Sequence, residues 1–324
     1  MKLLCLSADD LHAALPMDEA VRVAKQAFAA YSSGRADAPL RTALSIPERA
    51  ATTLIMPCYL PDYGLGTKVV SIFPKNRGGL TPVISGLVVL LDPETGEPMA
   101  LVDGTALTAW RTGAASGAAT DLLSVEHARE AAVIGAGAQA RTQVLALDTV
   151  RSLVTIRIYS RTADRVRALI DELQPHASAT LVAAESAVAA VRDVAIVCTA
   201  TSSTTPVLDG NVLAPGTHVN AIGSFTTGMR EIDAGTIARA RVFVDSVAAA
   251  TAEAGDLLAA ETEGVTKRDD WTELGRVVSG TGAGREGNEI TLFKSVGLAV
   301  QDIATAGEAV TRARSAGLGT EVQV

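Results

Sequence analysis

Gly135-Ala136-Gly137-Ala138-Gln139-Ala140 forms a glycine-rich turn directly after the apolar run 131–134. A strand before the turn and a helix after it are the context that a dinucleotide-binding motif requires. Gly135 permits the tight turn, Gly137 lets the backbone approach a pyrophosphate, and Ala140 still allows close packing of helix on strand. The helix N-terminus, at Ala138 and Gln139, offers N–H groups to phosphates. The turn therefore predicts a Rossmann dinucleotide-binding domain.

The chain beyond this turn alternates between strands and helices. Strands are expected at 131–134, 155–159, 194–199, 218–223 and 241–244, and helices begin at Gln139 and Ala163. This alternation indicates a doubly wound parallel sheet. After the glycine-rich loop 279–287, a last helix is expected over Leu292–Val310.

The chain before the turn follows a different pattern. A first strand over 1–6 precedes a helix with apolar residues at Val21, Ala24, Phe28 and Tyr31. Short β-rich runs then follow at 41–46, 52–56, 66–72, 84–91 and 99–102, before a helix over 107–123. Strand after strand without helices between them predicts an antiparallel or mixed sheet, hence an α+β domain.

The expected fold class is α/β, with a Rossmann doubly wound parallel sheet plus a discontinuous α+β domain. At 324 residues the chain is long enough for two domains. Residues 123–302 are expected to form the Rossmann domain. Residues 1–122 with 303–324 are expected to form the second domain, because the last helix can return to it.

The end of the second Rossmann strand carries information about the cofactor. An Asp or Glu about 20 residues after the glycines would bind the ribose 2′-hydroxyl of NAD. This chain has Ser160, Arg161 and Thr162 there instead. Hydroxyls beside a guanidinium suit a 2′-phosphate, which a carboxylate would repel. We therefore expect NADP(H) to be preferred, with NAD(H) possible.

Composition excludes several classes of protein. The net charge is −8 and basic residues do not cluster, so nucleic acid is not an expected partner. No apolar run reaches the length of a membrane span, and the short apolar start has no signal-peptide core. The three cysteines and four histidines lack metal-ligand spacing, so no metal is expected, and His218 alone lies near the cofactor side. The expected location is the cytoplasm.

Several motifs resemble, in order, those of the ornithine cyclodeaminase/mu-crystallin family along nearly the whole chain. They are Leu54-Ile55-Met56-Pro57, Gly66-Thr67-Lys68-Val69-Val70-Ser71, Leu101-Val102-Asp103-Gly104, Arg111-Thr112-Gly113-Ala114-Ala115-Ser116, Ile134–Arg141, Asn220-Ala221-Ile222-Gly223-Ser224 and Phe293-Lys294-Ser295-Val296-Gly297. The resemblance implies that the α+β domain binds the substrate and forms a homodimer. It also implies further cofactor-binding positions at Thr108, Cys198, Thr199, Ala200, Ile222, Gly223, Ser224, Lys294 and Ser295.

In relatives three basic residues hold the carboxylate of the substrate, and the matching positions are Arg41, Lys68 and Arg111. Arg offers two parallel donors to a carboxylate, whereas Lys offers a point charge that could also deliver a proton. Lys68 lies in an apolar strand, where an unpaired cation would be costly. Structural ion pairing is the alternative for each residue. Thr81 is expected to add a hydroxyl contact, and Lys68 is the candidate catalytic residue.

Two departures from the family pattern bear on the substrate. Cyclodeaminases have a Glu three residues before the proline of the Met-Pro pair, and Leu54 stands there. Cyclodeaminases and alanine dehydrogenases also carry an Asp in the loop after Asn-Ala-x-Gly, where this chain has Phe225. Losing both carboxylates removes partners for a primary amine. The Gly-Ser-Phe-Thr sequence at 223–226 resembles the branch that reduces cyclic imines.

The leading hypothesis is an NAD(P)H-dependent oxidoreductase that reduces Δ1-pyrroline-2-carboxylate or Δ1-piperideine-2-carboxylate to proline or pipecolate. Its protein partner would be a second copy of the chain. One alternative is an ornithine cyclodeaminase or an alanine-dehydrogenase-type amino-acid oxidoreductase with rearranged ammonium contacts. Another is a non-catalytic NADPH-binding protein similar to mu-crystallin.

Overall fold

A computed structural model describes residues 2–76 and 78–323 and divides into two compact units. Unit 1 comprises Met1–Arg111 with Leu298–Val324, and unit 2 comprises Thr112–Gly297. The sequence placed the boundaries after residues 122 and 302 instead. The structural division falls inside the helix Gly104–Leu123 (α3), because Trp110 donates a hydrogen bond to Leu15 O in unit 1 whereas Thr120 accepts one from Asn220 in unit 2.

Unit 1 contains a seven-stranded mixed sheet in the order β15-β1-β6-β5-β4-β3-β2. Its strands are β1 (Lys2–Leu6), β2 (Thr42–Ile46), β3 (Ala51–Leu60), β4 (Gly64–Ile72), β5 (Ile84–Leu91), β6 (Pro98–Asp103) and β15 (Thr320–Gln323). β1 is parallel to β6, and every other neighbouring pair is antiparallel. The sequence predicted an antiparallel or mixed sheet, and the sheet is mixed, although the sequence did not predict β15.

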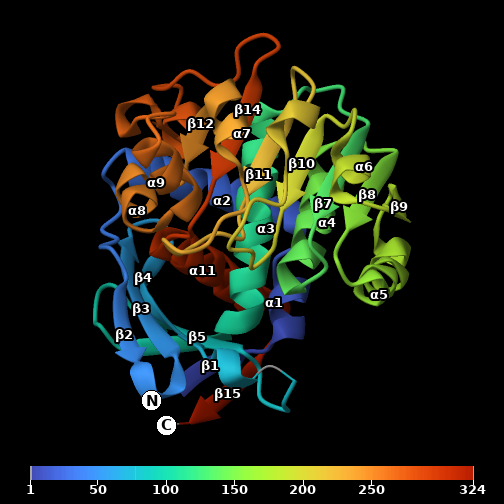
Figure 1. The fold of residues 1–324 in the computed structure, drawn as a ribbon. Coiled ribbons are helices and arrows are strands. Elements are labelled where there is room, and N and C mark those ends of the chain that lie inside the picture. Colours follow the sequence, from blue (N-terminus) through green and yellow to red (C-terminus); the bar gives the residue numbers. More distant parts are fainter. Residues whose placement is uncertain (1, 77, 324) are drawn as a thin grey trace. The chain divides into compact units, whose positions relative to one another are not determined.

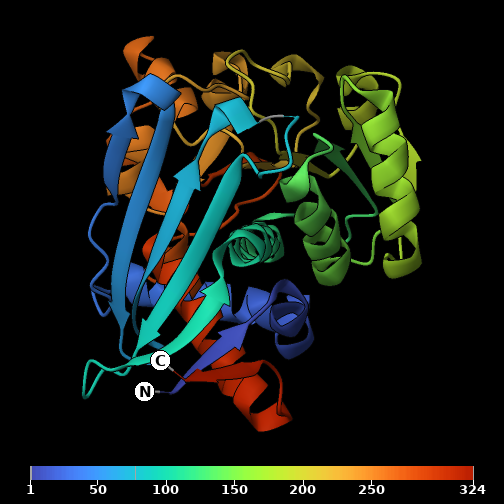
Figure 2. The same ribbon diagram turned by 90° about the horizontal axis from the view of Figure 1, so that it is seen from below.

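Two helices of unit 1, α1 (Ala8–Ala14) and α11 (Ala299–Ala316), lie against this sheet, and a third, α2 (Met17–Ser32), packs on α11 (Figures 1 and 2). The short 3₁₀ turns are Pro47–Arg49 and Pro74–Asn76. The sheet face under α11 is apolar, apart from Lys68. Because side chains alternate along a strand, Lys68 points to the covered face and Val69 to the other.

Unit 2 is a doubly wound parallel sheet in the order β13-β12-β14-β11-β10-β7-β8-β9. Its strands are β7 (Glu130–Ile134), β8 (Thr155–Tyr159), β9 (Thr180–Ala183), β10 (Ile196–Thr199), β11 (His218–Ala221), β12 (Ala240–Val244), β13 (Thr272–Glu273) and β14 (Ile290–Lys294). The strand order reverses at β7, which has β8 on one side and β10 on the other. The predicted Rossmann fold is confirmed.

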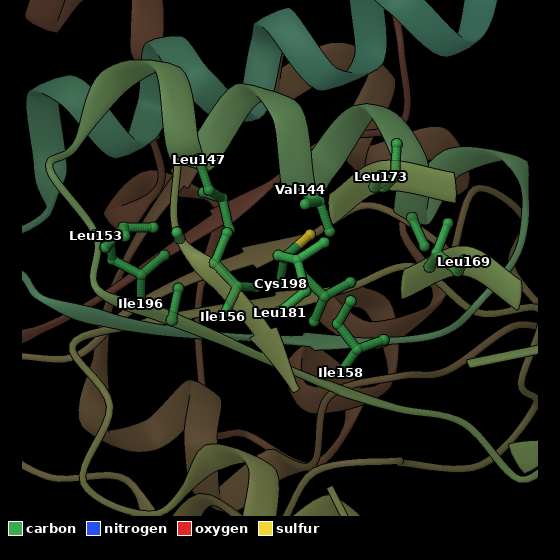
Figure 3. Close-up of a cluster of buried hydrophobic side chains, with 14 of the residues drawn as sticks. Val144, Leu147, Leu153, Ile156, Ile158, Leu169, Leu173, Leu181, Ile196 and Cys198 are labelled. Carbon is green, nitrogen blue, oxygen red and sulfur yellow. The ribbon is translucent and has the colours of Figure 1, made fainter. Parts of the chain in front are cut away.

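The helices of unit 2 connect these strands. They are α4 (Ala138–Val150), α5 (Ala163–Leu173), α6 (Ala187–Val191), α7 (Ala234–Arg239), α8 (Val247–Glu253), α9 (Gly255–Thr262) and α10 (Leu274–Val278), with 3₁₀ turns at Gln174–His176, Gly210–Val212 and Arg268–Asp270. Figure 3 shows Val144 and Leu147 of α4 above Ile156 and Ile158 of β8 in a buried apolar cluster. This cluster holds the first helix rigidly on the sheet and so fixes the turn that precedes it.

The predicted helix over Leu292–Val310 is wrong at its start. Residues 290–294 form β14, which inserts between β11 and β12, and α11 begins only at Ala299. Gly297 has a φ of 85°, which ends the extended segment before the helix. A short apolar run does not distinguish a buried strand from a buried helix, so periodicity could not separate the two elements. None of the described helices combines the length and apolar character needed to cross a membrane.

Candidate active site

Unit 1 buries two cations around one carboxylate. Lys68 Nζ on β4 lies 2.8 Å from Oδ1 and 2.7 Å from Oδ2 of Asp302, in the first turn of α11. Arg111 Nε in α3 donates to the same Oδ1 at 3.0 Å. All three side chains are buried, with Asp302 fully inaccessible. Two positive charges thus share one negative charge, and the cluster keeps an excess of one positive charge away from water.

The surroundings of Lys68 make its proton easier to lose. Burial lowers the pKa of Lys68 to about 8, although the carboxylate of Asp302 opposes this shift. The charges of Arg111 and Arg41 lower the pKa of Lys68 further, so both guanidinium groups act on it electrostatically. An ammonium group with a pKa near neutrality can donate a proton and be reprotonated at physiological pH.

Gln301 completes the support of Arg111. Its Oε1 accepts from Arg111 Nη1 at 3.1 Å and from the backbone N–H of Leu298 at 2.9 Å. The sequence predicted a helix that begins at residue 107, which would place Arg111 near its start, but α3 begins at Gly104 and Arg111 lies in its interior. That correction matters because an interior position lets the side chain point at α11 rather than at the end of its own helix.

Sequence reasoning missed Asp302 and Gln301. Asp302 lies 234 residues from Lys68 and 191 from Arg111 along the chain, so no local spacing relates them. One signal was available, since a carboxylate in the apolar first turn of a buried helix requires a cationic partner. The other expected substrate-binding residues lie elsewhere in unit 1: Arg41 is half-buried just before β2, and Thr81 is exposed in the connection between β4 and β5.

In unit 2 the glycine turn has the geometry of a phosphate cradle. Gly135 has a φ of 129°, and a Cβ there would lie 2.4 Å from the carbonyl oxygen of Ala200. Gly137 is the N-cap of α4, and a Cβ there would meet no atom within 4 Å. The space beside Gly137 is therefore open, and the first-turn N–H groups of Ala138 and Gln139 stand next to it. These residues fit a dinucleotide pyrophosphate.

The predicted specificity residues follow β8. Ser160 is half-buried, and Arg161 and Thr162 are exposed, with Thr162 the N-cap of α5. The backbone N–H of Gly135 donates to Tyr159 O, which places this strand end beside the glycine turn. Arg161 therefore follows a strand end that is hydrogen-bonded to the glycine turn.

The other expected cofactor positions also lie in unit 2, except for Thr108, which is in the unit 1 part of α3. Most are at the carboxyl ends of β10, β11 and β14, and many of their side chains already contact protein. Cys198 Sγ contacts Gln143, Ser224 Oγ donates to Met229 O, Ser295 Oγ donates to Asp245, and Lys294 Nζ lies 2.8 Å from Asp256. Thr199 and Ile222 are buried, whereas Ala200 is half-buried and Gly223 backs onto the loop after β10. These positions can therefore offer mainly backbone groups to a ligand.

His218 is structural in this geometry. Its ring is buried in β11 between Thr291 Oγ1 at 2.9 Å and Asn220 Oδ1 at 3.2 Å. Burial lowers the pKa of His218 to about 3, so the ring is neutral at physiological pH. Among residues 2–76 and 78–323, no group of three or more His, Cys, Asp or Glu side chains could hold a metal ion.

Comparisons with known proteins show the family to which the chain belongs. A model of the ornithine cyclodeaminase/mu-crystallin family matches residues 1–316. A Δ1-pyrroline-2-carboxylate reductase of Bacillus cereus is 38% identical over 99% of this chain and 100% of its own length. The same reductase from Thermococcus litoralis, solved with NADH and L-proline, superposes with a TM-score of 0.95 at 38% identity, covering 99% of this chain and 100% of its own. An archaeal alanine dehydrogenase dimer with bound NAD superposes with a TM-score of 0.92 at 31% identity, covering 100% of this chain and 99% of its own. The chain therefore belongs to the ornithine cyclodeaminase/mu-crystallin family.

Proposed function

We propose that this protein reduces a cyclic imino acid, Δ1-pyrroline-2-carboxylate or Δ1-piperideine-2-carboxylate, with a nicotinamide cofactor. The observation that carries the proposal is the buried cluster of Lys68, Arg111 and Asp302 with its excess positive charge. A monocarboxylate would neutralise that charge. Arg111 and Arg41 would orient the carboxylate, and Lys68 would bind it at close range.

The same cluster supplies a proton where the reaction needs one. A protonated imine accepts hydride far better than a neutral one, so a proton must reside on the ring nitrogen. Lys68, with its pKa lowered to about 8 by burial, is the proposed donor, either directly or through a water. Asp302 would keep the Lys68 ammonium oriented by contacting it with both oxygens. The cofactor, when bound, supplies the hydride.

The family comparison supports a ring rather than a free amine. Leu54 lies on the same face of the sheet as Lys68, because Met56 is the partner of Lys68 in register and Leu54 is two residues along. Leu54 therefore presents an apolar side chain at the position where cyclodeaminases have a Glu. Phe225 occupies the segment after β11 where an Asp would hold an ammonium group. An apolar ring that lacks a primary amine suits these two positions.

A substrate panel tests the proposal. Purified protein would be assayed at 340 nm with Δ1-pyrroline-2-carboxylate, Δ1-piperideine-2-carboxylate, and pyruvate with ammonia, each with NADH and NADPH, and with L-ornithine in the presence of NAD+ or NADP+. We expect turnover with the two cyclic imines to exceed the rest by at least about tenfold in kcat/KM. Preference for pyruvate with ammonia would instead indicate an alanine dehydrogenase. Ornithine consumed without net absorbance change would indicate a cyclodeaminase. Tight nucleotide binding without any turnover would indicate a binding protein.

Arg161 is proposed to favour NADPH over NADH. Its guanidinium stands exposed after β8 and could pair with a 2′-phosphate. We expect Arg161→Ala to raise the KM for NADPH about 10- to 100-fold and to leave the KM for NADH nearly unchanged, as loss of a charge-assisted hydrogen bond predicts. The matched control is Arg165→Ala, an exposed arginine in the first turn of α5. A wild-type protein with a clear preference for NADH would contradict this assignment.

A homodimer is proposed through the sheet face of unit 1 that points away from Lys68. Leu44, Val69 and Leu87 lie on that face and remain 53%, 38% and 42% exposed. Exposed apolar side chains on neighbouring strands are typical of an interface, and an archaeal relative is a dimer. We also propose a cytoplasmic location, which suits the free cysteines.

Leu87→Arg should convert the dimer to a monomer, because it places a charge among these apolar side chains without disturbing the covered face. Sedimentation velocity at micromolar concentrations would measure the state. Val154→Arg, at an exposed valine of unit 2, should leave the dimer intact. A monomeric wild type, or a variant that stays dimeric, would refute the assigned interface.

A further inference from the structure

Glu231 ties together the carboxyl ends of two neighbouring strands of unit 2. Its Oε1 accepts from the backbone N–H of Thr201 at 2.6 Å, just after β10. Its Oε2 accepts from the backbone N–H of Gly223 at 2.6 Å, just after β11, and from Thr199 Oγ1 at 3.0 Å. The side chain is fully buried. Three donors on one carboxylate, one from the end of β10 and one from each of the two following loops, hold those loops in a single arrangement.

A second carboxylate holds Glu231 itself. Asp256 Oδ1 in α9 accepts from the backbone N–H groups of Glu231 at 2.6 Å and Ile232 at 3.0 Å. Asp256 Oδ2 lies 2.8 Å from the buried ammonium of Lys294, at the end of β14. The chain of contacts therefore runs from β10 and β11 through Glu231 and Asp256 to β14. Separating a buried ion pair of this kind is costly, because each partner is then left as an uncompensated charge.

The loops after β10 and β11 approach each other and Glu231 closely. A Cβ on Gly223 would lie 2.1 Å from Thr201 O and 2.5 Å from Glu231 Oε1. The two loops and the carboxylate are thus in direct contact, and a shift of Glu231 must move both loops. Neither Thr201 nor Gly223 can adjust independently of the other.

The location of these loops gives Glu231 a role in cofactor binding. Gly135 abuts Ala200, so the phosphate turn adjoins the end of β10. In a doubly wound sheet a dinucleotide spans the point where strand order reverses, with its two halves on either side. Arg161, after β8, marks the adenosine half. The nicotinamide half would then rest on the ends of β10 and β11, which Glu231 joins.

We propose that Glu231 is a positioning residue for the nicotinamide half of the cofactor, acting through the backbone of Thr201 and Gly223. This inference rests on the proposed function, since it assumes a nicotinamide dinucleotide in unit 2. Glu231 does not touch the cofactor in this proposal. It holds the loops on which the ring lies and thereby the direction from which hydride leaves.

The test compares a whole dinucleotide with its adenosine half. NADH and AMP, and in parallel NADPH and adenosine 2′,5′-bisphosphate, would be titrated calorimetrically into wild type and Glu231→Gln. The glutamine keeps one acceptor oxygen but turns an NH₂ group toward one of the two backbone N–H donors. We expect the Kd for the reduced dinucleotide to rise about tenfold or more while that for the adenosine half stays within about twofold. A general folding defect would instead raise the Kd for both ligands.

Two further variants make the result decisive. Asp233→Asn changes a carboxylate two residues away that caps α7, and it should leave both affinities unchanged. Thr199→Val removes one donor to Glu231, and it should raise the Kd for the dinucleotide about threefold without changing the Kd for the adenosine half. If Glu231→Gln does not fold, Thr199→Val decides the question by the same comparison.

The outcomes separate this inference from the proposed function. A wild-type protein that binds neither ligand would overturn both. Normal wild-type binding with equal losses for both ligands in Glu231→Gln, or with no loss for either, would overturn only the role of Glu231.

Discussion

Lys68→Ala should lower kcat/KM for the cyclic imino acid about 10³-fold, because it removes both the excess positive charge and the proposed proton donor. Arg111 and Asp302 would remain paired, so the cluster would become neutral and would no longer attract a carboxylate. The loss should divide between KM, through weaker binding, and kcat, through slower protonation. Steady-state kinetics with Δ1-pyrroline-2-carboxylate would measure both.

Lys75→Ala provides the matched control, since Lys75 is an exposed lysine of the same unit. Its kinetics should equal those of the wild type. A Lys68→Ala protein that keeps its kcat and only raises KM would show that Lys68 binds the carboxylate but does not donate the proton.

The pH profile offers an independent check of the same residue. Donation requires the ammonium form, and the pKa of Lys68 is lowered to about 8. The kcat/KM of the wild type should therefore be highest below that pH and fall as pH rises through about 8. An ordinary lysine would keep its proton until about pH 10.4. A profile that is flat from pH 7 to 9.5 would exclude Lys68 as the donor.

Gly137→Ala should weaken dinucleotide binding about 100-fold and leave the stability of the free protein almost unchanged. The new methyl group would enter open space in the free protein, since a Cβ there meets no atom within 4 Å. It would then occupy the position of the pyrophosphate and block the approach of the backbone. Calorimetric titration with NADH and NADPH would measure the affinity, and thermal unfolding would measure stability.

Gly135→Ala serves as the comparison, because it should lower the stability of the free protein. Its φ of 129° and the Ala200 oxygen 2.4 Å from the new Cβ would strain the free protein. We expect the free energy of unfolding to fall by about 2–3 kcal/mol. If Gly137→Ala were the less stable of the two variants, or bound dinucleotide normally, the cradle would not be at this turn.

Local signals account for what was predictable about the fold. The strand, glycine turn and helix around Gly135 are neighbours in sequence, and their dihedral and packing requirements act over a few residues. The alternation of strands and helices then sufficed for the parallel sheet. Where local signals were ambiguous the prediction failed, as at residues 292–294, which belong to β14 rather than to the last helix.

The sequence by itself determined the Rossmann turn, the antiparallel or mixed sheet of the other unit, the family, and the candidate cations Lys68 and Arg111. Only the tertiary structure decided that both cations share Asp302, and that Glu231 joins the ends of β10 and β11. The physical reason is that a buried charge is stabilised by whichever partner the fold brings within about 3 Å, however far away that partner is in the chain. Periodicity and turn chemistry report the backbone, whereas these pairings exist only once the core has packed.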